Sequence, residues 1–169
     1  MASGKTAVGR ELARRLRTRF LDTDALVVDA HGPIPEIFAA HGEPGFRDYE
    51  SEALLEAAER TDRGGGVVAT GGGAVLSPGN RELLKGRFTV YLSSDAETVL
   101  PRISNPSTRP LLAGDPVQRW LEIYEVRRPF YAECATLVVD AREGTPAQIA
   151  AQIADAYRRR TSTPGGTTA

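Results

Sequence analysis

The sequence contains little cysteine and little histidine, and these shortages exclude several kinds of site. Cys134 is the single cysteine, so no disulfide can form within the chain. His31 and His41 are its two histidines, and together with one cysteine they are too few for a structural zinc site of the usual cysteine and histidine type. Sparse cysteine is typical of a reducing compartment, and we therefore expect a cytoplasmic protein.

Strong net charge and long apolar runs are also missing. The chain carries 21 Lys and Arg against 22 Asp and Glu, so electrostatics give no reason to expect binding to nucleic acid or to an acidic membrane. No apolar run approaches the roughly 20 residues of a membrane-spanning helix, and the start lacks the apolar core of a signal peptide. A length of 169 residues predicts a single domain with a two-sided core.

Helical and strand-like segments alternate along the chain, which predicts a parallel sheet covered by helices. Strands are expected at 20–21, 66–70, 88–92 and 137–140. Helices are expected at about 6–16, 25–30, 35–41, 46–60, 78–84, from 95, at 116–132 with a kink near Pro129, and at 146–157. The predicted domain covers 1–160, and the polar, glycine-containing segment 161–169 is predicted to be a disordered tail.

The first residues match the end of a phosphate-binding pattern. Ser3-Gly4-Lys5-Thr6 fits the end of G-x-x-x-x-G-K-[ST], in which backbone N–H groups wrap phosphates, the lysine reaches the β and γ oxygens, and the hydroxyl ligates Mg²⁺. Val8, Leu12 and Leu16 then recur every four residues and predict an amphipathic helix with its N-terminus toward an anion. A basic helix with a flexible polar start is the alternative.

Two carboxylates follow the first predicted strand. Asp22-Thr23-Asp24 lies at the carboxyl end of that strand, the edge at which open parallel sheets bind ligands. We expect separate roles for the two acids: one could hold a Mg²⁺-bound water, and the other could accept a proton from an attacking hydroxyl. An ordinary turn followed by a helix cap would use the same residue types, so that interpretation stays open.

Three consecutive glycines follow the second predicted strand. Gly71-Gly72-Gly73 has a high entropic cost on folding, so its use indicates a required backbone shape. A close approach of the backbone to a ligand is the best reason for it, because exposed N–H groups there could hold a carboxylate or a phosphate. A plain tight turn, which needs one or two glycines, is the competing interpretation.

Three arginines lie near ends or breaks of predicted structure: Arg47, Arg109 and Arg127. A guanidinium group binds a carboxylate or phosphate through two parallel hydrogen bonds. Arg109 falls in the stretch 104–110, where two prolines and small polar residues prevent regular structure and give the composition of a mobile lid. For each arginine taken alone, a solvated surface position is the competing interpretation.

Taken in order, these pieces resemble the shikimate kinases, which are small P-loop kinases of the nucleoside-monophosphate-kinase type. The similarity spans roughly 3–157, and the combination of motifs at these spacings is highly specific. The matching residues are Ser3-Gly4-Lys5-Thr6, Asp22-Thr23-Asp24, Ile37-Phe38, Gly42-Glu43, Phe46-Arg47, Glu50, Gly71-Gly72-Gly73-Ala74-Val75, Thr108-Arg109-Pro110-Leu111-Leu112, and Arg127, Pro129 and Tyr131 of an Arg-x-Pro-x-Tyr motif.

The resemblance implies a three-layer α/β/α P-loop kinase fold with a central parallel sheet, a small substrate-binding helical region at about 24–60 and a lid at about 103–112. It implies ATP-dependent phosphorylation of the 3-hydroxyl of shikimate to shikimate 3-phosphate, a step of aromatic amino-acid biosynthesis in the chorismate pathway. Mg²⁺ would assist, ATP and shikimate would be the binding partners, and a monomer is expected.

On the phosphate side, the resemblance implies that Ser3, Gly4 and Lys5 contact ATP. Thr6 would ligate Mg²⁺, and Asp22 would join through water. Phosphoryl transfer needs mainly positioning and charge neutralisation, which cations and backbone donors supply.

On the substrate side, Asp24 resembles the residue that binds a ring hydroxyl of shikimate and acts as the base. Arg47 and Arg127 match the pair that clamps the shikimate carboxylate. Gly71, Gly72 and Gly73 match the loop whose backbone meets the substrate.

Three further residues are assigned by the resemblance. Arg109 resembles the lid arginine that closes on the transferred phosphoryl group, and with Lys5 and Asp24 it completes the implied catalytic set. Arg102 and Pro146 fall where the family places groups against adenine. Pro101 departs from this pattern, because a proline inside the predicted helix should kink it beside Arg102.

The resemblance also implies that this sequence lacks the first strand and the first half of the phosphate loop. In that fold the missing strand is central, so we expect a longer gene product that starts upstream of Met1. An added apolar strand that ends in Gly-x-x-x before Ser3 should restore folding and activity. Two alternatives stay open: a related small-molecule kinase such as a gluconate kinase, and a truncated non-catalytic homologue that binds nucleotide.

Overall fold

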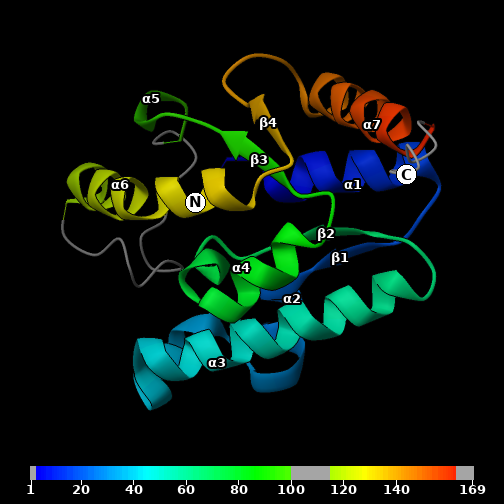
Figure 1. Ribbon diagram of the computed structural model, residues 1–169. Helices are drawn as coiled ribbons and strands as arrows, with labels where there is room; N and C mark the ends of the chain where they lie inside the picture. Colours follow the sequence, from blue (N-terminus) through cyan, green and yellow to red (C-terminus); the bar gives the residue numbers. More distant parts are fainter. Residues whose placement is uncertain (1–2, 100–114, 163–169) are drawn as a thin grey trace, which may run out of the picture.

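The structure is a computed structural model that describes residues 3–99 and 115–162, in which helices and short strands alternate as predicted (Figure 1). The α-helices are α1 (Lys5–Leu16), α2 (Thr23–His31), α3 (Ile34–Asp62), α4 (Pro78–Lys85), α5 (Ala96–Val99), α6 (Pro116–Cys134) and α7 (Pro146–Ser162). The strands are β1 (Phe20–Asp22), β2 (Val67–Ala69), β3 (Val90–Ser93) and β4 (Leu137–Asp140), and a 3-10 turn, η1, covers Ala74–Leu76.

The strands pair in parallel, as the alternation of strands and helices predicts. β1 lies beside β2 with Leu21 opposite Val68, and β3 lies beside β4 with Tyr91 opposite Val138. In the part of the chain that the structure describes, β2 and β3 do not pair, so the strands form two separate two-stranded sheets.

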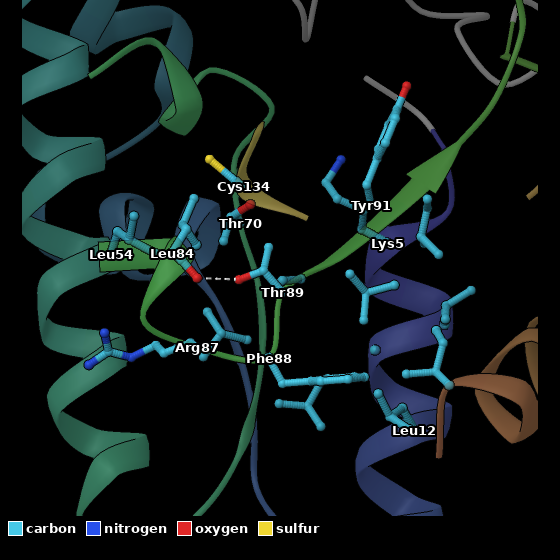
Figure 2. A pocket seen from close by; sticks show the side chains of 18 of the residues that line it. Lys5, Leu12, Leu54, Thr70, Leu84, Arg87, Phe88, Thr89, Tyr91 and Cys134 are labelled. Carbon is cyan, nitrogen blue, oxygen red and sulfur yellow. Dashed lines mark hydrogen bonds between the residues drawn. The ribbon is translucent and has the colours of Figure 1, made fainter. Parts of the chain in front are cut away.

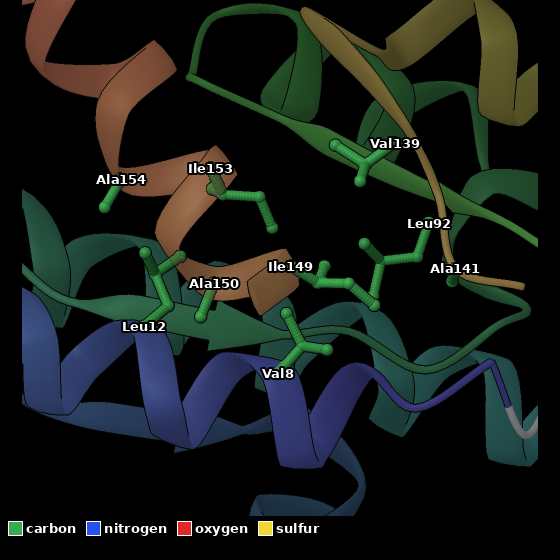
Figure 3. Close-up of a cluster of buried hydrophobic side chains, with 9 residues drawn as sticks. All are labelled: Val8, Leu12, Leu92, Val139, Ala141, Ile149, Ala150, Ile153 and Ala154. Atoms are coloured by element: carbon green, nitrogen blue, oxygen red, sulfur yellow. The ribbon is translucent and has the colours of Figure 1, made fainter. Parts of the chain in front are cut away.

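The main hydrophobic core joins α1 and α7 to β3 and β4 (Figure 3). Val8 and Leu12 lie four residues apart and therefore share one face of α1. That face packs against Ile153 of α7 and against Leu92 and Val139 of the strands. In Figure 1, α1 and α7 lie together on one side of β1 and β2, whereas α2 and α3 lie on the other side, which gives three layers.

Two further clusters hold the helices on the opposite side. Leu54 of α3, Leu84 of α4 and Cys134 of α6 are buried together beside η1. Burial raises the pKa of the Cys134 thiol, so it stays protonated and acts as a small apolar side chain. A separate cluster, which includes Val27 and Phe46, packs α2 onto α3 and so fixes the residues that follow Phe46.

α3 bends at one glycine. The two helices predicted at 35–41 and 46–60 are one element, Ile34–Asp62, with non-helical backbone at Gly42. Gly42 has φ 67°, a left-handed conformation that glycine adopts without the penalty of a Cβ atom. The predicted break is therefore in the right place.

α7 is longer than predicted and includes the first two residues of the predicted tail. Thr161 Oγ1 donates to the carbonyl oxygens of Tyr157 at 3.2 Å and Arg158 at 3.1 Å, so its hydroxyl bonds to the preceding turn of the helix. The rest of the tail, the predicted lid at 103–112 and Pro101 lie outside the described residues. Across the described segments, every helix is too short or too polar to cross a bilayer.

Candidate active site

A hydroxyl and a carboxylate join the start of α1 to the end of β1. Thr6 Oγ1 donates a hydrogen bond of 2.9 Å to Asp22 Oδ2. The other oxygen of Asp22 accepts from the backbone N–H of Asp24 at 3.1 Å and caps α2. Asp22 therefore caps a helix, as one of the two interpretations predicts, and it also faces the hydroxyl of the phosphate-loop fragment.

The phosphate-loop fragment forms the N-terminus of α1. Gly4 has φ 87° and directly precedes the helix, and its carbonyl accepts from Val8 N–H at 3.0 Å. Lys5 is the first helical residue, at the end where free N–H groups and the helix dipole favour an anion. Ser3 and Lys5 also line a cavity between β2 and β3. The residues predicted to contact phosphate thus share one helix end.

The glycine loop after β2 is held by hydrogen bonds from two distant elements. Gly71 N–H donates to Thr23 Oγ1 at 2.9 Å, and Thr23 is fully buried. Tyr131 Oη on α6 donates to the carbonyl oxygen of Gly72 at 2.6 Å. The loop is therefore held from the start of α2 and from α6.

Side chains approach this loop so closely that a Cβ atom at either of two glycines would force a charged side chain to move. A Cβ atom on Gly71 would overlap the Glu50 carboxylate and would lie 2.8 Å from Asp24 Oδ1. A Cβ atom on Gly73 would overlap the guanidinium group of Arg47. The sequence predicts a close approach of this backbone to a ligand, whereas the groups that approach it in the structure are charged side chains of the protein itself.

Arg47 is held by two carboxylates on its own helix. Its Nη1 atom lies 2.7 Å from Glu50 Oε2, and its Nη2 atom lies 2.8 Å from Glu43 Oε1. Burial raises the pKa of Glu50, which is 2% exposed, although Arg47 opposes the rise. Burial alone would lower the pKa of Arg47, but the two carboxylates outweigh it and the pKa is raised. Arg47 therefore stays charged in a fixed orientation.

Arg127 completes the cluster from α6. It is buried, and its charge acts on Glu50 and on Tyr131. Burial raises the pKa of Tyr131, and Arg127 opposes that rise. The negative charge of Asp24 acts on Glu50 as well, and raises the pKa of Glu50 further. The structure thus brings Asp24, Arg47 and Arg127 together around the glycine loop, as their joint assignment to one substrate predicts.

This cluster can bind a small anion that carries hydroxyl groups. Arg47 and Arg127 supply cations in a partly desolvated setting, where a hydrogen-bonded carboxylate gains most. Asp24 is exposed and lies beside Gly71, so its carboxylate can accept a hydrogen bond, and then a proton, from a hydroxyl.

Thr6 and Asp22 fit a magnesium ion by donor type. In the segments that the structure describes, no three His, Cys, Asp or Glu side chains gather into a metal cluster. Mg²⁺ does not need such a cluster, because it binds through one or two protein oxygens and keeps waters and phosphate oxygens as its other ligands. The hydroxyl and the carboxylate, 2.9 Å apart at the helix end, are oxygen donors of this kind.

Of Arg102, Arg109 and Pro146, which are predicted to meet adenine or the transferred phosphoryl group, the structure describes Pro146. Arg102 and Arg109 lie outside the described residues. Pro146 is the first residue of α7 and is exposed. The loop before it is held by Arg142, which forms hydrogen bonds with the carboxylate of Asp140 and lowers its pKa to about 2.

Three residues of the site had no assigned role in the sequence interpretation. Thr23 was noted only as the centre of Asp-Thr-Asp, yet its hydroxyl holds the glycine loop. Glu50 and Tyr131 were noted only as parts of a resemblance, yet each lies three or four residues after an arginine of the clamp on the same helix. That spacing places side chains on one helix face, and it is the signal that could have identified both.

Comparison with known proteins gives one consistent result. The family model described as shikimate kinase matches residues 1–158. A shikimate kinase of Streptomyces coelicolor is 43% identical over 157 residues, which cover 92% of this chain and 90% of that protein. A shikimate kinase of Symbiobacterium thermophilum is 42% identical over 165 residues, which cover 95% of this chain and 93% of that protein.

Solved structures give the same result. The shikimate kinase of Acinetobacter baumannii in complex with shikimate superposes with a TM-score of 0.89 at 36% identity, covering 96% of this chain and 91% of that one. The shikimate kinase of Aquifex aeolicus superposes with a TM-score of 0.81 at 31% identity, covering 97% of this chain and 95% of that one.

The buried hydrogen bond between Thr23 and the glycine loop can be tested by substitution. Thr23→Val keeps the shape of the side chain but leaves the Gly71 N–H without its acceptor. We expect a loss of about 1–3 kcal/mol in the free energy of unfolding, measured by chemical denaturation.

Thr23→Ser is the matched control, because it keeps the hydroxyl and removes only a methyl group, worth about 0.8 kcal/mol. A Thr23→Val variant that is no less stable than Thr23→Ser would show that the hydrogen bond does not hold the loop.

Proposed function

The chain belongs to the shikimate kinase family, and we propose that it transfers the γ-phosphoryl group of ATP to the 3-hydroxyl of shikimate, forming shikimate 3-phosphate. The observation that carries this proposal is the cluster of Arg47, Arg127 and Asp24 around the glycine loop. Shikimate is a small ring with one carboxylate and several hydroxyls, and this cluster offers a partner of the right charge for each group. The reaction would be a step of aromatic amino-acid biosynthesis.

Arg47 and Arg127 bind the shikimate carboxylate. Arg47 is positioned before substrate arrives, because its ion pairs with Glu43 and Glu50 fix the guanidinium group against Gly73. Preorganisation of this kind lowers the entropic cost of binding. Arg127 reaches the same cluster from α6 and is buried, so water competes little for its charge.

Asp24 orients the reacting hydroxyl and accepts its proton. Its carboxylate lies beside Gly71, at the carboxyl ends of β1 and β2. The backbone N–H of Asp24 donates a hydrogen bond to Asp22 Oδ1, and this bond connects Asp24 to the phosphate side of the site. A hydroxyl bound to Asp24 is thereby held next to the end of α1, where the phosphates of ATP bind.

Ser3, Gly4, Lys5 and Thr6 bind the phosphates of ATP at the N-terminus of α1. Lys5 neutralises charge on the transferred group, and the helix end supplies N–H donors. Thr6 and Asp22 would hold Mg²⁺, which neutralises phosphate charge when it is bound. Arg109 would add positive charge at the transferred phosphoryl group, and Arg102 and Pro146 would contact adenine; these three assignments rest on the family resemblance.

Release of ADP in a coupled assay tests the reaction. With ATP and Mg²⁺ present, we expect ADP release to depend on shikimate and to be absent with gluconate. Release with gluconate instead of shikimate would identify a gluconate kinase. Nucleotide binding without ADP release from either acid would identify a non-catalytic relative.

The carboxylate clamp is tested by Arg47→Ala and Arg127→Ala. Each variant should raise the KM for shikimate by roughly 30- to 1,000-fold, equivalent to about 2–4 kcal/mol, while the affinity for ATP hardly changes. The matched control is Arg63→Ala at the exposed end of α3, where the side chain is 81% exposed. Shikimate KM values near that of the parent protein in both clamp variants would show that the clamp assignment is wrong.

The proposed base is tested by Asp24→Asn. The amide keeps the size of the side chain but cannot take up the proton, so kcat should fall by about 10²- to 10⁴-fold with little change in nucleotide affinity. Asp29→Asn, an exposed acid on the same helix, serves as the control. Turnover equal to that of the control variant would reduce Asp24 to a structural residue.

A further inference from the structure

Asn80 on α4 is a buried amide that has no part in the reaction proposed above. It is 6% exposed, and a buried polar side chain needs hydrogen-bond partners. Its Nδ2 atom lies 3.0 Å from Ser51 Oγ and 3.0 Å from the carbonyl oxygen of Ala74. A carbonyl oxygen can only accept, so the NH₂ group of the amide faces it, and each proton of that group has an acceptor. The amide therefore joins α4 to α3 and to η1.

The two acceptors of this amide flank the contact between Arg47 and Gly73. Ser51 Oγ donates in turn to the carbonyl oxygen of Arg47 at 2.9 Å, one turn earlier on α3. Ala74 directly follows Gly73, where an added Cβ atom would overlap the guanidinium group of Arg47. One amide thus holds both the helical turn that carries Arg47 and the backbone against which Arg47 packs.

η1 is also held to α4 and α6 by Arg81. Nη1 of Arg81 donates to the carbonyl oxygen of Val75 at 2.9 Å. The guanidinium carbon of Arg81 lies 4.5 Å from the centre of the Phe130 ring on α6, a favourable contact between a cation and an aromatic face. The position of η1 is therefore set by α4 and α6, and the hydrogen bond from Asn80 to Ser51 relates that position to α3.

Apolar packing joins α3 to α4 as well, but it is not directional. Leu54 of α3 and Leu84 of α4 belong to one buried cluster, and Figure 2 shows their side chains next to each other. Apolar contacts tolerate small shifts of one helix along the other. A hydrogen bond from nitrogen to oxygen, by contrast, holds its two atoms within a range of roughly 0.5 Å. The amide of Asn80 therefore supplies a directional part of the contact between the two helices.

We propose that Asn80 is a positioning residue that sets the spacing between Arg47 and the backbone of Gly73. This spacing determines where the guanidinium group of Arg47 meets the substrate carboxylate. The inference rests on the proposed function, because it assigns Asn80 to the shikimate side of the site. The proposed ATP side lies at the start of α1, which is not one of the elements that Asn80 joins.

Asn80→Leu tests the proposal, because leucine has nearly the shape of asparagine but can neither donate nor accept a hydrogen bond. Ser51→Ala is a second, milder variant that removes the acceptor on α3 and remains usable if Asn80→Leu folds poorly. Thr89→Val is the matched control. Thr89 Oγ1 donates to the carbonyl oxygen of Leu84 at 2.7 Å, so this variant removes one hydrogen bond at the C-terminal end of the same helix (Figure 2).

Asn80→Leu should raise the KM for shikimate by roughly tenfold or more, because small displacements of a binding group are costly. The KM for ATP should stay within about twofold of the parent value. In an Arg47→Ala background, Asn80→Leu should change the shikimate KM by less than about twofold, since the residue through which Asn80 acts is gone. Ser51→Ala should show the same pattern with a smaller rise, and Thr89→Val should leave both KM values near those of the parent.

Equal rises of the shikimate KM with and without Arg47 would overturn the proposal, because Asn80 would then act by another route. A rise for Thr89→Val as large as that for Asn80→Leu would also overturn it, since loss of stability alone would explain both. Unchanged shikimate KM values in Asn80→Leu and Ser51→Ala would overturn the positioning role and leave the proposed function intact.

Amide hydrogen exchange supplies a readout that needs no substrate. Leu76 N–H donates to the carbonyl oxygen of Gly73 at 2.9 Å, so its exchange reports on the backbone that Asn80 holds. Exchange at Leu76 should be faster in Asn80→Leu than in Thr89→Val, and equal exchange would overturn the proposal. If the parent protein releases no ADP with shikimate, the proposed function fails, and this exchange measurement alone decides whether Asn80 fixes the backbone at Gly73.

Discussion

The buried carboxylate of Glu50 is the constraint on which the site depends. A carboxylate that is 2% exposed is stable in its charged form only beside cations, and Arg47 and Arg127 both act on it. Arg47 is thereby directed against Gly73, where a Cβ atom would overlap its guanidinium group, and Glu50 itself occupies the space beside Gly71. One buried acid therefore orients Arg47, lies against the glycine loop and interacts electrostatically with Arg127.

The glycine loop connects this acid to the rest of the fold. Thr23 holds one end of the loop from the start of α2, and Tyr131 holds its centre from α6. The residue after Thr23 is Asp24, and the residue before it is Asp22, which faces Thr6 at the end of α1. Continuous contacts therefore run from the proposed phosphate site to the proposed carboxylate site. Phosphoryl transfer needs this fixed spacing more than it needs reactive side chains.

Much of the fold could be predicted from the sequence, because its signals are local. Strand and helix order follow from periodicity, and the break at Gly42 and the cap at Ser77 follow from residue types. The extra length of α7 could not be predicted from residue types, because Thr161 stabilises the helix end through hydrogen bonds that composition does not reveal. The missing pairing between β2 and β3 was expected only from the family resemblance.

The sequence predicts which residues form the site better than it predicts the contacts between them. Asp24, Arg47, Arg127 and the glycines were each identified from motifs, and the structure brings them together. The role of Thr23 depends on a contact between residues that are distant in sequence, the hydrogen bond from Gly71 to Thr23. Long-range contacts of this kind leave no periodic trace in a single sequence.

The most direct test of this account is a binding cycle between Arg47 and the shikimate carboxylate. Calorimetry would give the affinities of the parent protein and of Arg47→Ala for shikimate and for its neutral carboxamide. If Arg47 binds the carboxylate, replacing shikimate by its neutral carboxamide should weaken binding to the parent protein at least about tenfold more than binding to Arg47→Ala. This difference corresponds to a coupling free energy of about 1.4 kcal/mol. An equal loss in both proteins would contradict the account, because the arginine that Glu50 positions would then have no contact with the substrate's charge.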